Sequence, residues 1–171
     1  MRLLATLGSL RAVIVALLGI TAAQIGLVAF SNITDFGTNA EFVRHVLAMD
    51  TTFRTGTSMW RAITDPALVQ AAYLAIIAWE VLTALVLLAA LVAWLRPGLS
   101  ERGAETARRL ASLGWLLEVL LFGGGFIAIG GEWFMMWESE DWNGLQPALQ
   151  NLIIAAFGLV LVHLPARRDN A

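Results

Sequence analysis

Four polar side chains stand inside strongly apolar stretches of this sequence. Glu80 lies in "YLAIIAWEVLTALVLLAALVAWL" and Glu118 in "LASLGWLLEVLLFGGGF", and the amides Gln24 and Asn151 lie in two further apolar stretches. An ionisable group within a membrane helix is costly and marks a candidate site for a proton, a cation or a ligand. Polar side chains between membrane helices also serve as packing contacts worth about 1 kcal/mol or less each. The sequence leaves both interpretations open and favours the structural network slightly.

A second group of chemically capable residues lies between the apolar stretches. His45 precedes Asp50 by five residues, and "GGEWFMMWESEDWNG" contains Glu132 and three further acidic residues. Oxygen ligands suit calcium or magnesium, and an imidazole with carboxylates could hold a transition metal. The spacing matches no EF-hand and no HExxH pattern, so a hydrogen-bonded histidine and a solvated acidic loop are favoured. His45, Asp50 and Glu132 are therefore weak metal candidates.

Other cofactor chemistry finds little support. The chain has no cysteine, which excludes thiol chemistry, disulfides and cysteine-ligated clusters. A haem held by two histidines would need His45 and His163 on one side of the membrane, and the predicted topology places them on opposite sides. No basic stripe or nucleic-acid motif occurs, so nucleic acid is not an expected partner. The sequence requires no cofactor.

The elements that must position these residues are predicted to be membrane helices. Of 171 residues, 58% are hydrophobic and 14% are charged, whereas soluble domains carry about 25% charged residues. A membrane helix needs about 20 mostly apolar residues. The first apolar stretch is too long for a signal-peptide core and lacks a small-x-small cleavage site, so it is predicted to stay in the mature protein. The prediction is an all-α membrane protein, a four-transmembrane-helix bundle in one domain (1–171), with spans at 12–30, 67–95, 110–131 and 147–164.

Arginine positions predict the orientation in the membrane. Positive residues gather on the cytoplasmic side, and the loop 132–146 has none. Both termini and the short second loop are therefore predicted to be cytoplasmic, with loops 31–66 and 132–146 on the outer side of the membrane. The arginines that carry this prediction are Arg2, Arg11, Arg96, Arg102, Arg108, Arg109, Arg167 and Arg168.

The long outer loop 31–66 is predicted to contain a short amphipathic helix. Thr38 precedes Glu41 by three residues, which is the spacing of a capping box. The residues that follow place one apolar face on the helix, and such a helix is expected to lie on the bundle or on the outer leaflet. This face comprises Phe42, Val43, Val46, Leu47 and Met49.

Helix geometry predicts that the intramembrane polar residues form one layer. With a rise of about 1.5 Å per residue, Gln24, Glu80 and Asn151 lie roughly 20 Å above the cytoplasmic ends of their helices, and Glu118 roughly 12 Å. The amides are expected to donate to the carboxylate, and a direct pair between the two glutamates is not expected. A triple glycine at the same height favours tight packing over room for a ligand or water. The predicted layer comprises Gln24, Glu80, Glu118, Gly123, Gly124, Gly125 and Asn151.

The tryptophans follow the pattern of interfacial aromatic belts. Four of them fall at the predicted outer interface and Trp94 falls at the inner one. Trp79 and Trp115 lie inside spans and are expected to pack within the bundle. The outer four are Trp60, Trp133, Trp137 and Trp142.

Several segments together resemble a known family. "NITDFGTNAEFVRHVLAMDTTF", "WRAI", "YLAIIAWE" and "GGEWFMMWESEDWNG" are similar to the predicted small integral membrane proteins grouped as DUF2165. The resemblance covers most of the chain, implies a four-helix bacterial inner-membrane protein and implies no activity. The residues that fit the family pattern are Glu80 and those of a predicted outer cap, namely Asn32, Asp35, Asn39, His45, Asp50, Trp60, Arg61, Glu132, Trp133, Trp137 and Trp142.

Three classes of function fit the sequence. The favoured one is non-enzymatic: an accessory or assembly subunit of a larger membrane complex, or a homo-oligomer, surrounded by the lipid bilayer and partnered by other membrane subunits or copies of itself. A proton- or cation-linked carrier or binding protein that uses Glu80 is the alternative. A membrane enzyme with a metal site on the outer face is the least favoured. Small-xxx-small pairs that could pack helices are Gly19/Ala23, Ala22/Gly26 and Ala71/Ala75.

Overall fold

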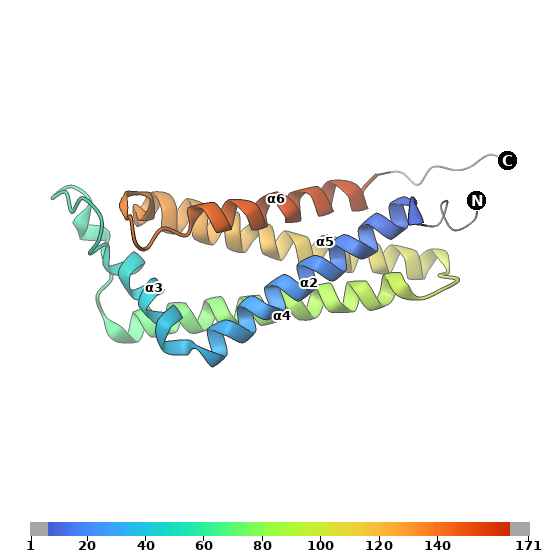
Figure 1. The fold of residues 1–171 in the computed structure, drawn as a ribbon, viewed down its shortest axis with the longest axis horizontal. Helices are drawn as coiled ribbons and strands as arrows, with labels where there is room; N and C mark the ends of the chain where they lie inside the picture. Colours follow the sequence, from blue (N-terminus) through green and yellow to red (C-terminus); the bar gives the residue numbers. More distant parts are fainter. Residues whose placement is uncertain (1–6, 165–171) are drawn as a thin grey trace.

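The computed structural model describes residues 7–164, and in this range the chain folds into an all-helical bundle (Figure 1). The four longest helical rods are each long and apolar enough to cross a bilayer. The predicted all-α architecture with four candidate spans is therefore confirmed. The rods are α2 (Leu10–Thr34), α4 (Pro66–Leu95), α5 (Glu101–Val119) continued by η2 (Leu120–Trp133), and α6 (Leu145–Val162).

The helices differ from the predicted spans mainly at polar ends. Helix α2 continues past residue 30 to Thr34, and α5 begins at Glu101 instead of residue 110. Helix α6 begins at Leu145 and ends at Val162, two residues earlier at each end than predicted. Hydropathy marks only the part of a helix that suits hydrocarbon, whereas backbone hydrogen bonding continues into polar turns. The first turn of α5 shows this, because the Ser100 side chain caps it by accepting from Gly103 N–H.

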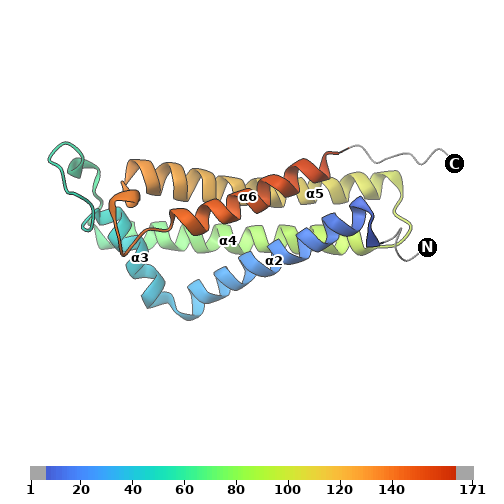
Figure 2. The same cartoon turned by 45° about the horizontal axis from the view of Figure 1, so that its top comes forward.

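The four rods form a closed ring. Helix α2 packs against α4, α4 against α5, α5 against α6, and α6 back against α2. The first turn of α2 and the last turn of α6 lie at one end of the bundle, which we call the terminal end (Figure 1). Helix α3 (Phe36–Ala48) lies across the other end, the capped end, toward which α2 diverges from α6 (Figure 2). The ring is therefore widest beside α3.

Local interactions set the ends of α4. Asp65 accepts hydrogen bonds from the N–H groups of Ala67 and Leu68, and Pro66 occupies the first helical position. At the other end, Arg11 of α2 donates to the carbonyl oxygens of Trp94 (2.8 Å) and Arg96 (2.7 Å). A cation at these carbonyls also complements the helix dipole. This contact joins α2 to α4 at the terminal end.

Two glycines allow α5 to approach its neighbours closely. A Cβ at Gly158 of α6 would lie 2.3 Å from the Trp115 ring, and a Cβ at Gly114 would lie 2.5 Å from Leu87 of α4. Trp115 is fully buried, as predicted, and its indole N–H donates to Thr21 Oγ1 (3.2 Å). The core of the bundle is therefore built around one tryptophan that contacts both α2 and α6.

Trp79 does not pack within the bundle. Its side chain lies at the surface, 36% exposed, and its indole N–H donates to the carbonyl oxygen of Leu117 (3.0 Å). The surface around it is apolar, because large aliphatic side chains on the outer faces of all four rods are exposed. An apolar outer surface of this kind is compatible with contact with lipid chains.

The second half of the third rod, η2, is a π-helix. Its end shows the wider hydrogen-bond pattern, in which Phe134 N–H donates to the carbonyl oxygen of Ile129 (3.0 Å), five residues back. The stretch contains Gly123–Gly125 and the pair Gly130 and Gly131. Glycine weakens α-helical preference, and π-helical turns are frequent at functional sites.

Helix α3 begins earlier than predicted. It starts at Phe36, after a break at Asp35 (φ −113°, ψ 51°), so Thr38 lies inside the helix and does not cap it. The helix ends at Ala48, and the following residue, Met49, has a left-handed backbone (φ 52°) and is fully buried. Val43 packs against Tyr73 and Ile77 of α4. The amphipathic helix is therefore present and lies on the bundle, with a start set by the break after α2.

Three of the arginines used to predict the orientation lie outside the described residues. They are Arg2, Arg167 and Arg168. Arg96 and Arg102 lie at or near the turn between α4 and α5, beside the Arg11 contact at the terminal end. Positive residues are therefore present at this end within residues 7–164.

Candidate functional site: a cavity beneath the cap

Glu80 is the buried carboxylate at the capped half of the bundle. Its side chain is only 1% exposed, and its Oε2 accepts a hydrogen bond from the Asn32 side-chain amide (2.7 Å). Tyr73 O–H donates to the backbone carbonyl oxygen of Asn32 (2.9 Å). Within residues 7–164, Asn32 is the only hydrogen-bond partner of the Glu80 side chain. The contact joins the end of α2 to the middle of α4.

The two amides expected to contact Glu80 pair with each other instead. Gln24 Nε2 donates to Asn151 Oδ1 (2.7 Å), and Asn151 Nδ2 donates to the carbonyl oxygen of Pro147 (2.8 Å). The Gln24–Asn151 bond links α2 to α6 across the ring. The amide that reaches Glu80 is Asn32, which the sequence placed in the cap.

A cavity of about 320 Å³ lies above this polar layer and beneath α3. Its wall combines apolar and aromatic side chains with Glu80, Tyr73 and several amides, a composition common in small-molecule sites. Helices α2, α3, α4, α6 and η2 all contribute. The lining residues are Val28, Asn32, Asn39, Phe42, Val43, Tyr73, Ile76, Glu80, Phe122, Phe126, Asn143, Gly144, Pro147, Ala148 and Asn151.

Glu118 is buried but does not line this cavity. The close approach of Gly114 to the Cα of Leu87 sets the register of α4 and α5. Counting from that contact places Glu118 about 4.5 Å nearer the terminal end than Glu80, roughly half the separation predicted from the sequence. The difference arises because α5 begins at Glu101. In the described part of the chain, no hydrogen bond joins the two glutamates.

Two of the three glycines Gly123–Gly125 make no close contact with another helix. A Cβ at Gly124 would meet no atom within 4 Å, and one at Gly125 would meet only Leu121 of its own helix, at 4.0 Å. Gly123 alone approaches another helix, since its Cβ would lie 3.3 Å from Leu152. The expectation of tight packing at Gly123–Gly125 is therefore wrong for two of the three.

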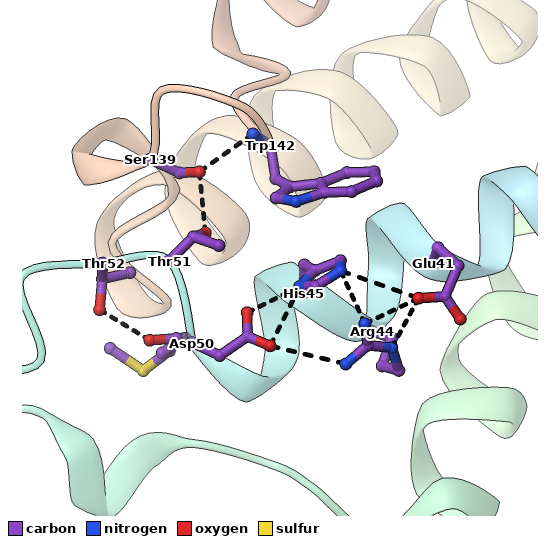
Figure 3. A network of polar contacts seen from close by, with 9 residues as sticks. Glu41, Arg44, His45, Asp50, Thr51, Thr52, Ser139 and Trp142 are labelled. Atoms are coloured by element: carbon purple, nitrogen blue, oxygen red, sulfur yellow. Dashed lines mark hydrogen bonds and ion pairs between the residues drawn. The ribbon is translucent and has the colours of Figure 1, made fainter.

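The cap over the cavity is held by a charged network on α3 (Figure 3). We define the cap as residues 36–65 together with 132–144. Arg44 Nε donates to Glu41 Oε2 (2.8 Å), and Arg44 Nη2 donates to His45 Nε2 (2.6 Å). His45 Nδ1 lies 2.8 Å from Asp50 Oδ1.

The partners of His45 assign its hydrogen-bond roles. Arginine can only donate, so in this arrangement Nε2 accepts from Arg44 and Nδ1–H donates to Asp50. The His45 ring also stacks on Trp142 (4.4 Å between centroids, 16° between planes). His45 thus joins α3 to the loop before α6.

The same network perturbs Glu41. The hydrogen bond from Arg44 is the largest effect and lowers the pKa of Glu41 below its ordinary value. Both side chains are about half exposed, so the ion pair is expected to stabilise α3 only modestly. The main effect of this ion pair is on geometry, because it holds the Arg44 guanidinium against the His45 ring.

Polar contacts join the first loop to the second. Thr51 Oγ1 and Ser139 Oγ share a hydrogen bond (2.8 Å), and Ser139 Oγ accepts from Trp142 N–H (3.0 Å). Glu138 Oε2 accepts from Phe53 N–H (2.8 Å). The predicted cap included Glu132 and no other acid of this loop. Glu132 is exposed, and Glu138 makes this contact instead.

The tryptophans of the second loop contact the first loop. Trp137 meets Phe53 edge to face (5.9 Å) and Trp133 meets Trp60 in the same way (5.6 Å). The guanidinium of Arg61 lies 4.8 Å from the centre of the Trp133 ring and donates to the Trp133 carbonyl oxygen (3.3 Å). These tryptophans, predicted as an interfacial belt, therefore also fasten the cap.

The joint between α2 and α3 accounts for the remaining predicted cap residues. Asp35 is exposed, and its carbonyl oxygen accepts from Asn39 Nδ2 (3.1 Å). The same amide also approaches the carbonyl oxygen of Ser31 (3.4 Å). Asn39 thus stabilises the break and lines the cavity at once.

The proposed metal ligands do not form a set. His45 and Asp50 are hydrogen-bonded to each other, but Glu132 belongs to no such group. Across the described ranges, no three His, Asp or Glu side chains gather closely enough to hold a metal ion. His163 lies at the terminal end, where its Nε2 is 3.0 Å from Ser112 Oγ.

The sequence missed several residues of the site. Tyr73 was not among the predicted site residues, although it is the only tyrosine of the chain and lies two turns before Glu80 on the same face of α4. Arg44 and Asn143 gave no signal, because a single charged or amide residue in a loop is ordinary. Ser139 could not be recognised either, since its partner Thr51 is far away in sequence.

A family model described as a predicted small integral membrane protein (DUF2165) matches residues 10–165. The chain belongs to the DUF2165 family. The match spans all four rods and the cap, and it confirms the resemblance seen in the sequence. Searches among curated proteins and among solved structures gave no match. For this DUF2165 protein, integral membrane character is therefore established by the family and by the four apolar helices.

Proposed function

We propose that this protein is a membrane-embedded binding protein whose cavity beneath the cap takes a small ligand that presents an amine or hydroxyl donor to Glu80. One observation carries the proposal: a fully buried carboxylate lines a cavity and has a single hydrogen-bond partner, Asn32. A buried carboxylate without enough donors is costly, by about 1–3 kcal/mol or more for a charged group. A donor or cation in the cavity would remove that cost.

The surrounding polar groups support this role because most already have partners. Asn151 is bonded on both sides of its amide, and Asn143 Oδ1 accepts from Leu145 N–H (3.1 Å). Asn32 is held by Glu80 and Tyr73. The lining is thus preorganised, and Glu80 retains the acceptor capacity that a ligand needs.

The test compares two buried glutamates in one protein. Purified wild type, Glu80→Gln and Glu118→Gln would be titrated in mild detergent with hexylamine, hexanol, hexanoate, Na⁺ and Mg²⁺, and unfolding would be followed by tryptophan fluorescence. At a hundred times Kd, the amine or the alcohol should stabilise wild type and Glu118→Gln by about 2.7 kcal/mol, which is observed as a higher thermal midpoint. Glu80→Gln should show a smaller rise, because its neutral amide oxygen is a weaker acceptor than a carboxylate. Stabilisation of Glu80→Gln equal to that of wild type would contradict the proposal, as would no stabilisation by any probe.

A second function, as an accessory subunit or homo-oligomer, is favoured by small residues that face outward. A Cβ at Gly19 would meet no atom within 4 Å, and Ala23 is exposed one turn later on α2. Ala71 and Ala75 are likewise exposed on α4, whereas the pair Ala22/Gly26 faces Ala84 inside the bundle. Outward small-xxx-small pairs permit close helix contact with another protein.

Native mass spectrometry of complexes from native membranes would test this second function. Gly19→Ile should dissociate a complex that uses this face, whereas Ala89→Ile, at an exposed position on α4, should leave it intact. A monomer without co-purifying proteins in wild type would exclude the accessory function.

The orientation belongs to the same proposal. We place the terminal end in the cytoplasm and the cap on the outer face of a bacterial inner membrane. Support comes from Arg11, Arg96 and Arg102 at the terminal end and from the lack of arginine in loop 132–146 of the cap.

A further inference from the structure

A second cavity, of about 330 Å³, lies beside the first and is almost entirely apolar. It is enclosed by α3, by the first part of α4 and by η2, where Gly125 and Gly130 leave room for it. Its wall contains no charged side chain. The lining residues are Phe42, Val43, Val46, Leu47, Ala72, Ala75, Ile76, Leu121, Gly125, Phe126, Ile129, Gly130, Phe134 and Met136.

The two cavities share one wall. Phe42, Val43, Ile76 and Phe126 border both of them. On one side of these four side chains lies Glu80 with its amides, and on the other side lies a wholly apolar space. A ligand that extended past this wall would meet a polar environment at one end and a hydrocarbon environment along the rest.

The apolar cavity reaches the surface that faces the bilayer. Ile129 of η2 is 54% exposed and Ala75 of α4 is also exposed, although both line the cavity. Both residues lie within helices long enough to span the membrane. The rim between α4 and η2 is therefore bordered by lipid chains and not by water.

The charges of the lining residues indicate which head group such a ligand would carry. Neither cavity is lined by an arginine or a histidine in the described chain, and the one charged group is the Glu80 carboxylate. An anionic head, such as a fatty-acid carboxylate or a phosphate, would meet this carboxylate without a compensating cation. An ammonium or hydroxyl head would instead donate to it.

From these observations we infer that the ligand is a single-chain amphiphile with an amine or hydroxyl head, which enters from the bilayer between α4 and η2. Its chain occupies the apolar cavity and its head reaches Glu80 along the shared wall. The inference rests on the proposed function and adds the class of ligand and the route. Pockets for small ligands are generally lined by apolar side chains, with a few polar groups that orient the ligand.

The experiment separates the chain from the head. Binding of hexylamine, oleylamine, oleyl alcohol and oleate to the purified protein would be measured by native mass spectrometry. Ala75→Phe places a ring at the rim of the apolar cavity. Ala71→Phe is the matched control, because it lies one turn away on α4, is exposed and lines neither cavity. Gly125→Val, inside the apolar cavity, is a second test in case Ala75→Phe misfolds.

The expected result has three parts. Oleylamine and oleyl alcohol bind wild type at least tenfold more tightly than oleate, and oleylamine binds at least tenfold more tightly than hexylamine. Ala75→Phe and Gly125→Val weaken oleylamine binding at least tenfold, whereas Ala71→Phe leaves it within twofold of wild type. Glu80→Gln removes the preference for oleylamine over oleate.

Different failures have different meanings. If Glu80→Gln abolishes amine binding but chain length and Ala75→Phe have no effect, the amphiphile inference is overturned and the proposed function stands. If Glu80→Gln binds both amines like wild type, or if no probe binds, the proposed function fails and the inference fails with it.

Discussion

Asn32 shows how a single side chain determines what the buried carboxylate can do. It lies on the face of α2 that also buries Ile25 and Ala29, so its amide points toward α4 and reaches Glu80. Gln24 points toward α6 and is used by Asn151. One amide donor therefore serves Glu80, which leaves the carboxylate ready to accept from a ligand.

The ion pair on α3 predicts a pH dependence. Because Arg44 lowers the pKa of Glu41 below 4.5, the pair stabilises the folded protein above about that pH, and this contribution is lost as pH falls through the folded-state pKa. The thermal midpoint of wild type should therefore exceed that of Glu41→Gln at pH 7, and the difference should shrink as the pH falls toward 3.

The matched control for this measurement is Glu140→Gln. Glu140 is exposed and forms no ion pair with any described residue. Its substitution should leave the difference from wild type small at every pH. A Glu41→Gln effect that persists at pH 3 would show that the carboxylate acts through something other than its charge.

At the level of elements, the approach of α5 to α6 depends on one glycine. The Trp115 ring is fully buried, bonded to Thr21 and packed where a side chain of residue 158 would lie. An added methyl group cannot be accommodated by moving a rigid, enclosed indole. The helices must therefore separate if residue 158 gains a Cβ.

Gly158→Ala should destabilise the protein by about 1–3 kcal/mol, the usual cost of overpacking a core. Gly19→Ala, in a helix interior with open space around it, is the control and should be neutral or slightly stabilising. Thermal unfolding in detergent measures both. Equal midpoints for the two variants would show that the Trp115 contact does not limit the helix spacing.

At the level of the whole molecule, the cap and the terminal end are chemically different faces of one bundle. The cap combines loops distant in sequence through the contacts of His45, Ser139 and Arg61. It covers both cavities from one side of the membrane.

The absence of cysteine makes the orientation directly testable. Single substitutions Glu140→Cys in the cap and Arg102→Cys near the terminal end supply one thiol each at exposed positions. In intact spheroplasts, a membrane-impermeant maleimide should label Glu140→Cys at once and Arg102→Cys only after the membrane is opened. The reverse pattern would invert the proposed topology.

Much of the architecture was predictable because hydropathy is a local property of the chain. Apolar stretches of about 20 residues have few stable alternatives to membrane helices, so the four rods and their order followed from composition. The burial of Glu80 and Glu118 also followed, since both stand inside such stretches.

Which polar side chains pair depends on the direction in which each helix face points, and composition does not encode that direction. Whether Gln24 or Asn32 meets Glu80 depends on the rotation of α2 and on its continuation to Thr34, and neither is marked by hydropathy. The same holds for Glu138 in place of Glu132, because the π-helix and the turn after it determine which acid faces the first loop. Sequence composition thus determined the helices and their environment, whereas the cavities and their polar contacts arose only from helix rotation, register and loop closure, which depend on residues far apart in the chain.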